Sequence, residues 1–186
     1  MHLLKTFAFL PLIPLVLSSP VLSKRDEASV LTGIQKIANA TLTLNNTVAS
    51  YPGGIEGTIT AVEILADSFA VINAIVSTTH DAKHSANFTD AESESIAEAF
   101  IGSLVPVVES SLTTIEGKKA DFEDGFLGIA SLTGLVETIL KELKSDSDNL
   151  AAAIVAKLTP IWAGVAPLIV AQIDDAFNTA ITTYAS

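Results

Sequence analysis

The chain contains no cysteine, and basic side chains are scarce: its 186 residues include 10 Lys and Arg against 21 Asp and Glu. Without cysteine no disulfide restricts the unfolded chain, so burial of apolar side chains must be the main source of stability. The formal net charge of −11 disfavours contact with nucleic acid and with anionic membrane surfaces, because both repel an acidic protein. We therefore expect no nucleic-acid partner.

The first 25 residues have the features of a secretory signal peptide. Lys5 precedes an apolar run from Phe7 to Leu17, and small residues such as Ser18 follow it. A membrane-spanning helix is the alternative, but three prolines interrupt the segment and the run is shorter than the roughly 20 residues that a span needs. The dibasic pair at 24–25 predicts processing before Asp26, which leaves residues 26–186 as the folded domain.

The signal peptide predicts a secreted, extracellular protein. The C-terminal residues lack the hydrophobic tail of a lipid-anchor signal, so the product should be free or held non-covalently. Three Asn-x-Thr sequons occur, at Asn39, Asn45 and Asn87. Asn39 and Asn87 are the preferred glycosylation sites. Asn45 is less favoured, because its helical phase points toward apolar neighbours whereas glycosylation needs exposure.

Apolar residues recur with the 3.6-residue period of amphipathic helices, and no convincing strand pattern occurs. The expected helices cover residues 26–50, 55–83, 90–116, 132–158 and 160–184. A helix of roughly 40 Å, such as 132–158, cannot bury its apolar stripe against itself, so helices of similar length must flank it. The sequence therefore predicts an all-α fold, a single-domain bundle of about five long helices.

Local signals refine the helix boundaries. Thr89 and Glu92 have the spacing of a capping box, which places a helix start near Asp90. Pro106 lies inside the third helix, where the missing backbone donor should kink the axis. Pro160 suits the first turn of the last helix. The segment 116–125 is charged and contains glycine, and is expected to be a connection.

The apolar faces of the helices should meet in the core. If this core is hollow, the side chains that line the hollow are expected to come from four of the five helices. The predicted apolar lining is Phe69, Ile72, Phe100, Leu104, Val108, Leu132, Leu135, Ile139, Leu143, Ile169, Ile173 and Phe177.

Four polar residues fall on or beside these apolar faces: Asn45, Asn73, Ser111 and Ser147. Burying an amide or hydroxyl without a partner costs roughly 1 to 3 kcal/mol. One interpretation is structural: the serines bond to the preceding helical turn, and the asparagines bond to each other or to buried water. The other is that some of them face an internal cavity and bind the polar head of an apolar ligand.

Signals for catalysis or metal binding are weak. His80 and His84 are four residues apart, but the Glu of the zinc-protease motif is replaced by Asp81, and no third ligand is evident. No G-x-S-x-G elbow is present, and the clustered carboxylates are more typical of solvated helix faces than of acid/base catalysis. We therefore expect a non-enzymatic protein with no catalytic residue, metal site or cofactor.

Several spaced motifs in the mature chain resemble the fungal hydrophobic surface binding protein A / cell-wall galactomannoprotein family. They are Tyr51-Pro-Gly-Gly54, Leu112-x-x-Ile115-x-x-Lys118-x-x-x-Phe122, Leu140-x-x-Leu143-Lys144-x-Asp146-x-x-x-Leu150-x-x-Ala153-x-x-x-Lys157 and Gln172-Ile-Asp-Asp-Ala-Phe177-x-x-Ala180-Ile181-x-x-Tyr184. The chain departs from the cell-wall antigens of the family in having one domain and no Ser/Thr-rich tail.

The resemblance implies a secreted, glycosylated, all-helical protein of fungal culture fluid or cell wall. Members of the family are described as adsorbing to hydrophobic surfaces, and some as enclosing long-chain fatty acids. The first expectation is therefore a protein that binds a fatty acid or similar lipid in the core of the bundle. The alternative is an interfacial adhesion protein that opens its bundle on a hydrophobic surface and recruits a secreted hydrolase. Cell-wall polysaccharide is a further expected partner.

Overall fold

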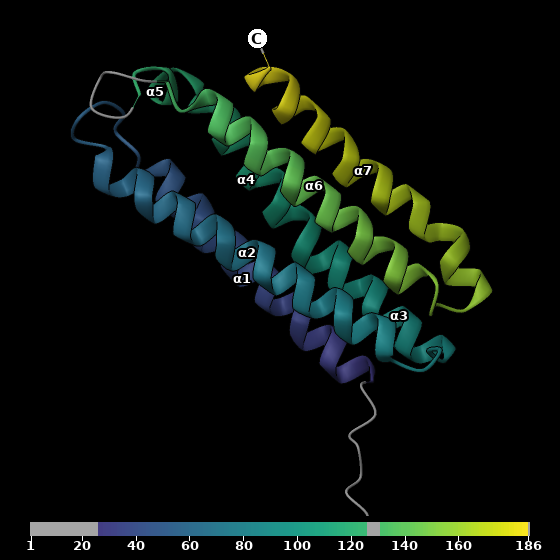
Figure 1. Cartoon of the computed structure of the whole chain (residues 1–186). Coiled ribbons are helices and arrows are strands. Elements are labelled where there is room, and N and C mark those ends of the chain that lie inside the picture. The colour runs from purple at the N-terminus through teal and green to yellow at the C-terminus, as the bar shows by residue number, and fades with distance from the viewer. Residues whose placement is uncertain (1–25, 126–130, 186) are drawn as a thin grey trace, which may run out of the picture.

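The structure, a computed structural model, describes residues 26–125 and 131–185 as an elongated bundle of helices (Figure 1). No strand occurs among these residues, so the predicted all-α fold is confirmed. The signal peptide lies outside the described residues. The elements in chain order are α1 (Glu27–Ala49), α2 (Thr58–His84), α3 (Asp90–Ala99), the π-helix η1 (Phe100–Leu104), α4 (Val105–Gly117), α5 (Lys119–Glu123), α6 (Thr133–Val155) and α7 (Pro160–Tyr184).

The helix starts follow the predicted signals. Asp26 caps α1, because its carboxylate accepts a hydrogen bond from the backbone N–H of Ser29. The capping box of α3 is confirmed: Thr89 Oγ1 accepts from the N–H of Glu92, and Glu92 Oε2 accepts from the N–H of Thr89 at 2.7 Å. Pro160 occupies the first turn of α7, where a helix needs no donor at that position.

The third predicted helix is interrupted by a π turn. The N–H of Val105 donates to the carbonyl of Phe100, five residues back, and Pro106 follows at the start of α4. A proline removes one N–H and its ring clashes with the carbonyl four residues earlier, so the wider turn accommodates it. The α3–η1–α4 rod, residues 90–117, thus runs past the proline as one element.

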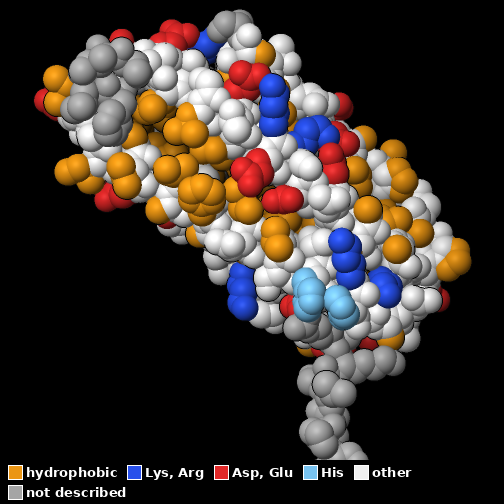
Figure 2. Space-filling model, viewed as in Figure 1, with side chains coloured by type: hydrophobic (Ala, Val, Ile, Leu, Met, Phe, Trp, Pro, Cys, Tyr) orange, Lys and Arg blue, Asp and Glu red, His pale blue; other side chains and the backbone are white. Residues whose placement is uncertain are grey.

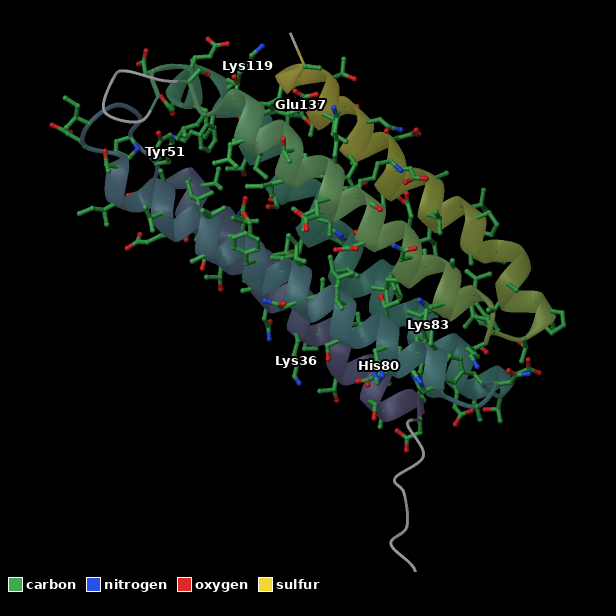
Figure 3. All side chains as sticks on the ribbon, viewed as in Figure 1. Lys36, Tyr51, His80, Lys83, Lys119 and Glu137 are labelled. Atoms are coloured by element: carbon green, nitrogen blue, oxygen red, sulfur yellow. The ribbon has the colours of Figure 1, made fainter. Side chains whose placement is uncertain are left out.

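The segment 116–125 was predicted to be a connection, but it contains the short helix α5, which closes one end of the bundle. Phe122 of α5 stacks on Tyr51 at 4.7 Å between ring centroids and meets the ring of Tyr184 edge-on at 6.1 Å. Lys118 Nζ donates to the carbonyl of Tyr51 at 2.8 Å, and Tyr184 OH donates to the carbonyl of Ile115 at 2.6 Å. Figure 3 shows Tyr51 at this end, beside α5.

Hydrogen bonds to the backbone also close the opposite end. Lys157 Nζ donates to the carbonyl of Ser85 at 2.9 Å, and the N–H of Phe88 donates to the carbonyl of Lys157 at 2.8 Å. These bonds join the turn after α2 to the turn after α6. The N–H of Thr159 donates to Ser93 Oγ at 3.2 Å, which ties the start of α7 to α3.

The orientation of α2 differs from the sequence prediction. Of its two residues predicted to point inward, Ile72 is buried and Phe69 is exposed. The buried side of α2 carries Ile64, Ser68, Val71, Ile72, Ile75, Thr78, Thr79 and Ala82. The large apolar side chains left in solvent on α2 and just before it are Ile55, Ile59, Val62, Phe69 and Val76. Figure 2 shows hydrophobic side chains gathered over the part of α2 nearest α5.

Small side chains and internal hydrogen bonds explain this orientation. A carbon atom added at Gly33 of α1 would lie 2.3 Å from Thr78 Oγ1, so α1 and α2 pack more closely than larger residues would allow. The buried hydroxyls of Ser68 and Thr78 donate to carbonyls four residues earlier, at 2.8 and 2.7 Å, which lowers the cost of burying them. The α2 helix therefore has two apolar faces, and the less hydrophobic one is buried.

The close approach at Gly33 predicts that Gly33→Ala destabilises the bundle by about 1 to 3 kcal/mol, because the new methyl group overlaps Thr78. Urea unfolding followed by circular dichroism measures the effect. The matched control is Gly134→Ala in α6, where nothing lies within 4 Å of the added carbon and stability should stay equal or rise. Equal unfolding midpoints for the two variants would show that α1 and α2 are not closely packed.

Candidate functional site

A cavity lies between the helices, with about 100 Å³ open to the centre of a water-sized sphere; the whole empty space, open solvent at the mouth included, is about 1180 Å³. Its walls come from α1, α2, the α3–η1–α4 rod, α6 and α7. The lining is almost entirely aliphatic and aromatic, with a few polar groups. Apolar pockets that carry a small number of polar groups are the usual form of a small-molecule binding site.

Most of the predicted apolar residues on the second half of the chain line this cavity. They are Phe100, Leu104, Val108, Leu143, Ile169, Ile173 and Phe177. Ile139 lines a second, smaller cavity, with about 30 Å³ open to the centre of a water-sized sphere. Leu44, Ile115 and Leu143 line both cavities and therefore form the wall between them.

The other four predicted residues lie elsewhere. Phe69, at 49% exposure, and Leu135, at 47%, are on the surface. Ile72 is buried in the core, and Leu132 is partly buried and packs against the core. Neither residue lines a cavity. Phe69 was predicted to line the core but is exposed, because the buried face of α2 is the less hydrophobic one.

Two of the four predicted polar residues line the cavity and two do not. Ser111 and Ser147 line the cavity, Ser111 from a buried position and Ser147 from a half-buried one. Asn73 is exposed, because it lies on the outer face of α2. Asn45 is half-buried and outside the cavity lining, although its Oδ1 is buried and has no hydrogen-bond partner. Of the four candidates, only Ser111 and Ser147 therefore fit the interpretation that some of them face a cavity.

Sequence reasoning missed the cavity wall contributed by α1. Ile37, Thr41 and Leu44 line it, and Thr41 Oγ1 is buried with no hydrogen-bond partner. Their spacing of four and three residues, which places them on one helical face, was an available signal. An unsatisfied hydroxyl in an apolar cavity is a group to which a polar ligand atom can bind.

One charged cluster borders the cavity, between α6 and α7. Lys144 Nζ donates to Asp174 Oδ1 at 2.7 Å and to Asp148 Oδ2 at 3.1 Å, and both aspartates line the cavity. The hydrogen bond from Lys144 lowers the pKa of Asp174, and the same bond raises the pKa of Lys144. Lys144 and Asp174 therefore stay charged at neutral pH, and Lys144 lies about one helical turn before Ser147 on α6.

The cavity reaches solvent between η1 and α7. Ile101 of η1 and Val165 of α7 both line it, and they are 55% and 42% exposed. Trp162 and Ile169 of α7 line it farther from solvent and are half-buried. An apolar molecule can therefore reach the interior through an opening whose rim is itself apolar.

Other sequence candidates lie apart from the cavity. The rings of His80 and His84 are 4.2 Å apart on α2, and His84 Nδ1 lies 2.7 Å from the carbonyl of His80. Figure 2 shows the histidine pair on the surface. Within residues 26–125 and 131–185, no group of three or more His, Asp or Glu side chains is placed to hold a metal ion. Asn39 and Asn87, the preferred glycosylation sites, are both exposed.

Comparison with solved structures finds close similarity of fold to fungal lipid complexes. One is AfMP4p in complex with palmitic acid, with a TM-score of 0.78 and 26% identity over 86% of this chain and 99% of that chain. Another is ligand binding domain 2 of the Penicillium marneffei MP1 protein complexed with multiple arachidonic acids, with a TM-score of 0.77 and 20% identity over 88% and 99%. Ligand binding domain 1 of MP1, also complexed with arachidonic acids, has a TM-score of 0.75 and 17% identity over 85% and 98%.

A search of curated protein sequences found no significant match. The sequence profile of the family "Hydrophobic surface binding protein A" matches residues 28–156, which include α1 to α6 and most of the cavity walls. The match confirms the resemblance noted from the spaced motifs. This chain belongs to the hydrophobic surface binding protein A family.

Proposed function

We propose that this protein is a non-enzymatic lipid-binding protein that encloses the chain of a fatty acid or similar lipid in its central cavity. The observation that carries the proposal is the cavity itself, an almost wholly apolar space that opens to solvent between η1 and α7. The palmitic acid complex of AfMP4p, a protein of the same fold, supports this choice of ligand. Secretion would bring the protein to extracellular lipids.

Burial of methylene groups would drive binding. Each buried methylene contributes about 0.8 kcal/mol, which corresponds to about fourfold in affinity. Affinity should therefore rise with chain length until the cavity is filled. The wall of Leu44, Ile115 and Leu143 limits this length, because the second cavity begins behind it.

The polar head would lie near Ser147 and the Lys144 cluster. Lys144 bonds to Asp148 and Asp174, both of which line the cavity, and its side chain is only 22% exposed. A carboxylate head could accept a hydrogen bond from the ammonium group or from the Ser147 hydroxyl. Thr41 and Ser111 are further hydroxyls along the walls.

Filling the cavity should abolish lipid binding. Ala151→Phe places a phenyl ring on a lining position of α6, whereas Ala152→Phe places the same ring on the exposed position beside it. We expect at least a tenfold loss of affinity for palmitate in the first variant and a change of less than twofold in the second. Displacement of a fluorescent fatty acid, with native mass spectrometry of the complex, measures both. Equal affinities in the two variants would place the ligand outside the cavity.

Removing the cation should discriminate between head groups. In Lys144→Met, Asp148 and Asp174 lose their ammonium partner and repel an anionic head. We expect roughly a tenfold loss of affinity for palmitate, a loss typical of one charge-assisted hydrogen bond, and little change for hexadecanol. Titration of both ligands against both proteins is the measurement. Parallel losses for the acid and the alcohol would show that Lys144 acts on the fold and not on the head group.

A second candidate function, adsorption to hydrophobic surfaces, is favoured by the exposed face of α2. Ile55, Ile59 and Val62 are 68%, 74% and 58% exposed on this side. By length and composition alone, α2 and the Asp90–Gly117 rod would suffice to cross a membrane, a property that core helices of water-soluble proteins share. The folded bundle thus already presents an apolar stripe, and adsorption by this route does not require the bundle to open. Cell-wall polysaccharide and a secreted hydrolase stay proposed partners.

The two routes to adsorption give different outcomes. If the stripe is the adsorbing surface, Ile59→Ser with Phe69→Ser should weaken retention on octyl-coated beads several-fold while palmitate affinity is unchanged. Palmitate-saturated wild-type protein should adsorb as well as the free protein. Adsorption that palmitate saturation abolishes, and that the two serines leave intact, would instead indicate that the bundle opens and spreads its core.

A further inference from the structure

We propose that the rim of the cavity mouth docks on uncharged lipid surfaces, so that a lipid passes between surface and cavity without crossing water. The docking surface is the exposed side chains of Ile101, Ile161, Val165 and Leu168. This inference rests on the proposed function, because it assigns a route by which the cavity is filled and emptied. It concerns a part of the molecule distinct from the exposed stripe of α2.

Two hydrogen bonds define the extent of the mouth. The α3–η1–α4 rod and α7 run in the same direction, since Ser93 bonds to Thr159, Glu109 to Gln172 and Ile115 to Tyr184. The first two of these contacts, at 3.2 and 2.7 Å, lie on either side of the opening. Halfway between them along both elements are Ile101 and Val165, two apolar lining residues that reach solvent.

The exposed residues of α7 lie on the edge that borders this opening. At about 100° per residue, Ile161, Val165, Leu168 and Gln172 fall within about 60° of one another around the helix. Gln172 contacts Glu109 of α4, so this edge faces the α3–η1–α4 rod. Ile161 is 71% exposed and Leu168 is 74% exposed. Large aliphatic side chains thus stand in solvent beside the mouth.

The interior and the rim form one continuous apolar path. Trp162 and Ile169 of α7 line the cavity, and Val165, between them, both lines it and reaches solvent. A lipid that left through this opening into water would expose its chain, at about 0.8 kcal/mol per methylene. If the rim is pressed into the apolar layer of a membrane, the chain stays in apolar surroundings throughout.

Charge selects the kind of surface. The α3, η1, α4 and α7 elements contain no Lys, Arg or His. They carry Glu94 and Glu98 within two helical turns before Ile101, and Glu109, whose carboxylate accepts a hydrogen bond from Gln172 at one end of the mouth. Anionic lipid attracts basic segments and repels acidic ones. The rim therefore suits a zwitterionic or neutral lipid surface. A second copy of the chain is a poorer partner, because each copy carries a net charge of −11.

Vesicle flotation and lipid transfer test the proposal. The full protein is mixed with phosphatidylcholine vesicles for flotation, and protein loaded with a fluorescent stearate is mixed with the same vesicles for transfer. We expect the protein to float, and the transfer rate to rise in proportion to vesicle concentration. Ile161→Ser with Leu168→Ser should reduce flotation and the slope of transfer about tenfold, with equilibrium affinity for the stearate within twofold of wild type. Adding phosphatidylserine to the vesicles should reduce both, and salt should restore them.

The control is Leu42→Ser with Leu135→Ser, which removes two exposed apolar groups, each 47% exposed, that lie outside both the rim and the α2 stripe and should leave flotation and transfer unchanged. Equal losses in the two variants, a transfer rate independent of vesicle concentration, or a change in sedimentation that shows a dimer formed through the rim would each overturn the docking proposal. If the protein floats through the rim but binds no stearate, the lipid-binding function fails while docking stands.

Discussion

Directional hydrogen bonds at the two ends of the bundle allow its middle to remain hollow. At one end Tyr184 bonds to the backbone of Ile115 and Lys118 to that of Tyr51, and at the other Lys157 bonds to the backbone of Ser85. These contacts fix the positions of the helices, so the space between them need not be filled to keep them apart. In this chain without cysteine, these hydrogen bonds hold the helix ends together, as disulfide bonds do in many small secreted proteins.

A hollow core has a thermodynamic consequence. Atoms that line an empty space lose the contacts they would have in a filled core, so the ligand-free protein is less stable than a solid bundle of equal size. A ligand that binds only the folded state returns stability, about 2.7 kcal/mol when its free concentration is a hundred times the dissociation constant. Folding stability and lipid occupancy are therefore linked in this architecture. Inside the cavity, the polar head of a ligand can form hydrogen bonds only where the wall carries a polar group, such as Thr41 or Ser111.

The features predictable from sequence were those with a single strong local cause. The helices and the lining residues of η1, α4 and α7 follow from periodicity on helices with one apolar face, and the capping box at Thr89 follows from the three-residue spacing of Thr89 and Glu92. The α2 helix has two apolar faces. Which face is buried depends on the close fit of Gly33 against Thr78, a contact between residues far apart in sequence. The π turn before Pro106 shifts the helical phase, which a uniform period cannot represent. The mouth was missed because exposure depends on how α7 sits against η1.

Trp162 is the only tryptophan of the chain, and its indole lines the cavity close to the opening. Indole emission shifts in wavelength when the surroundings change from water to hydrocarbon. All tryptophan emission of this protein therefore originates at the wall of the cavity. The molecule carries an intrinsic optical reporter, so the hydration of its interior can be followed in the unlabelled, unmodified chain.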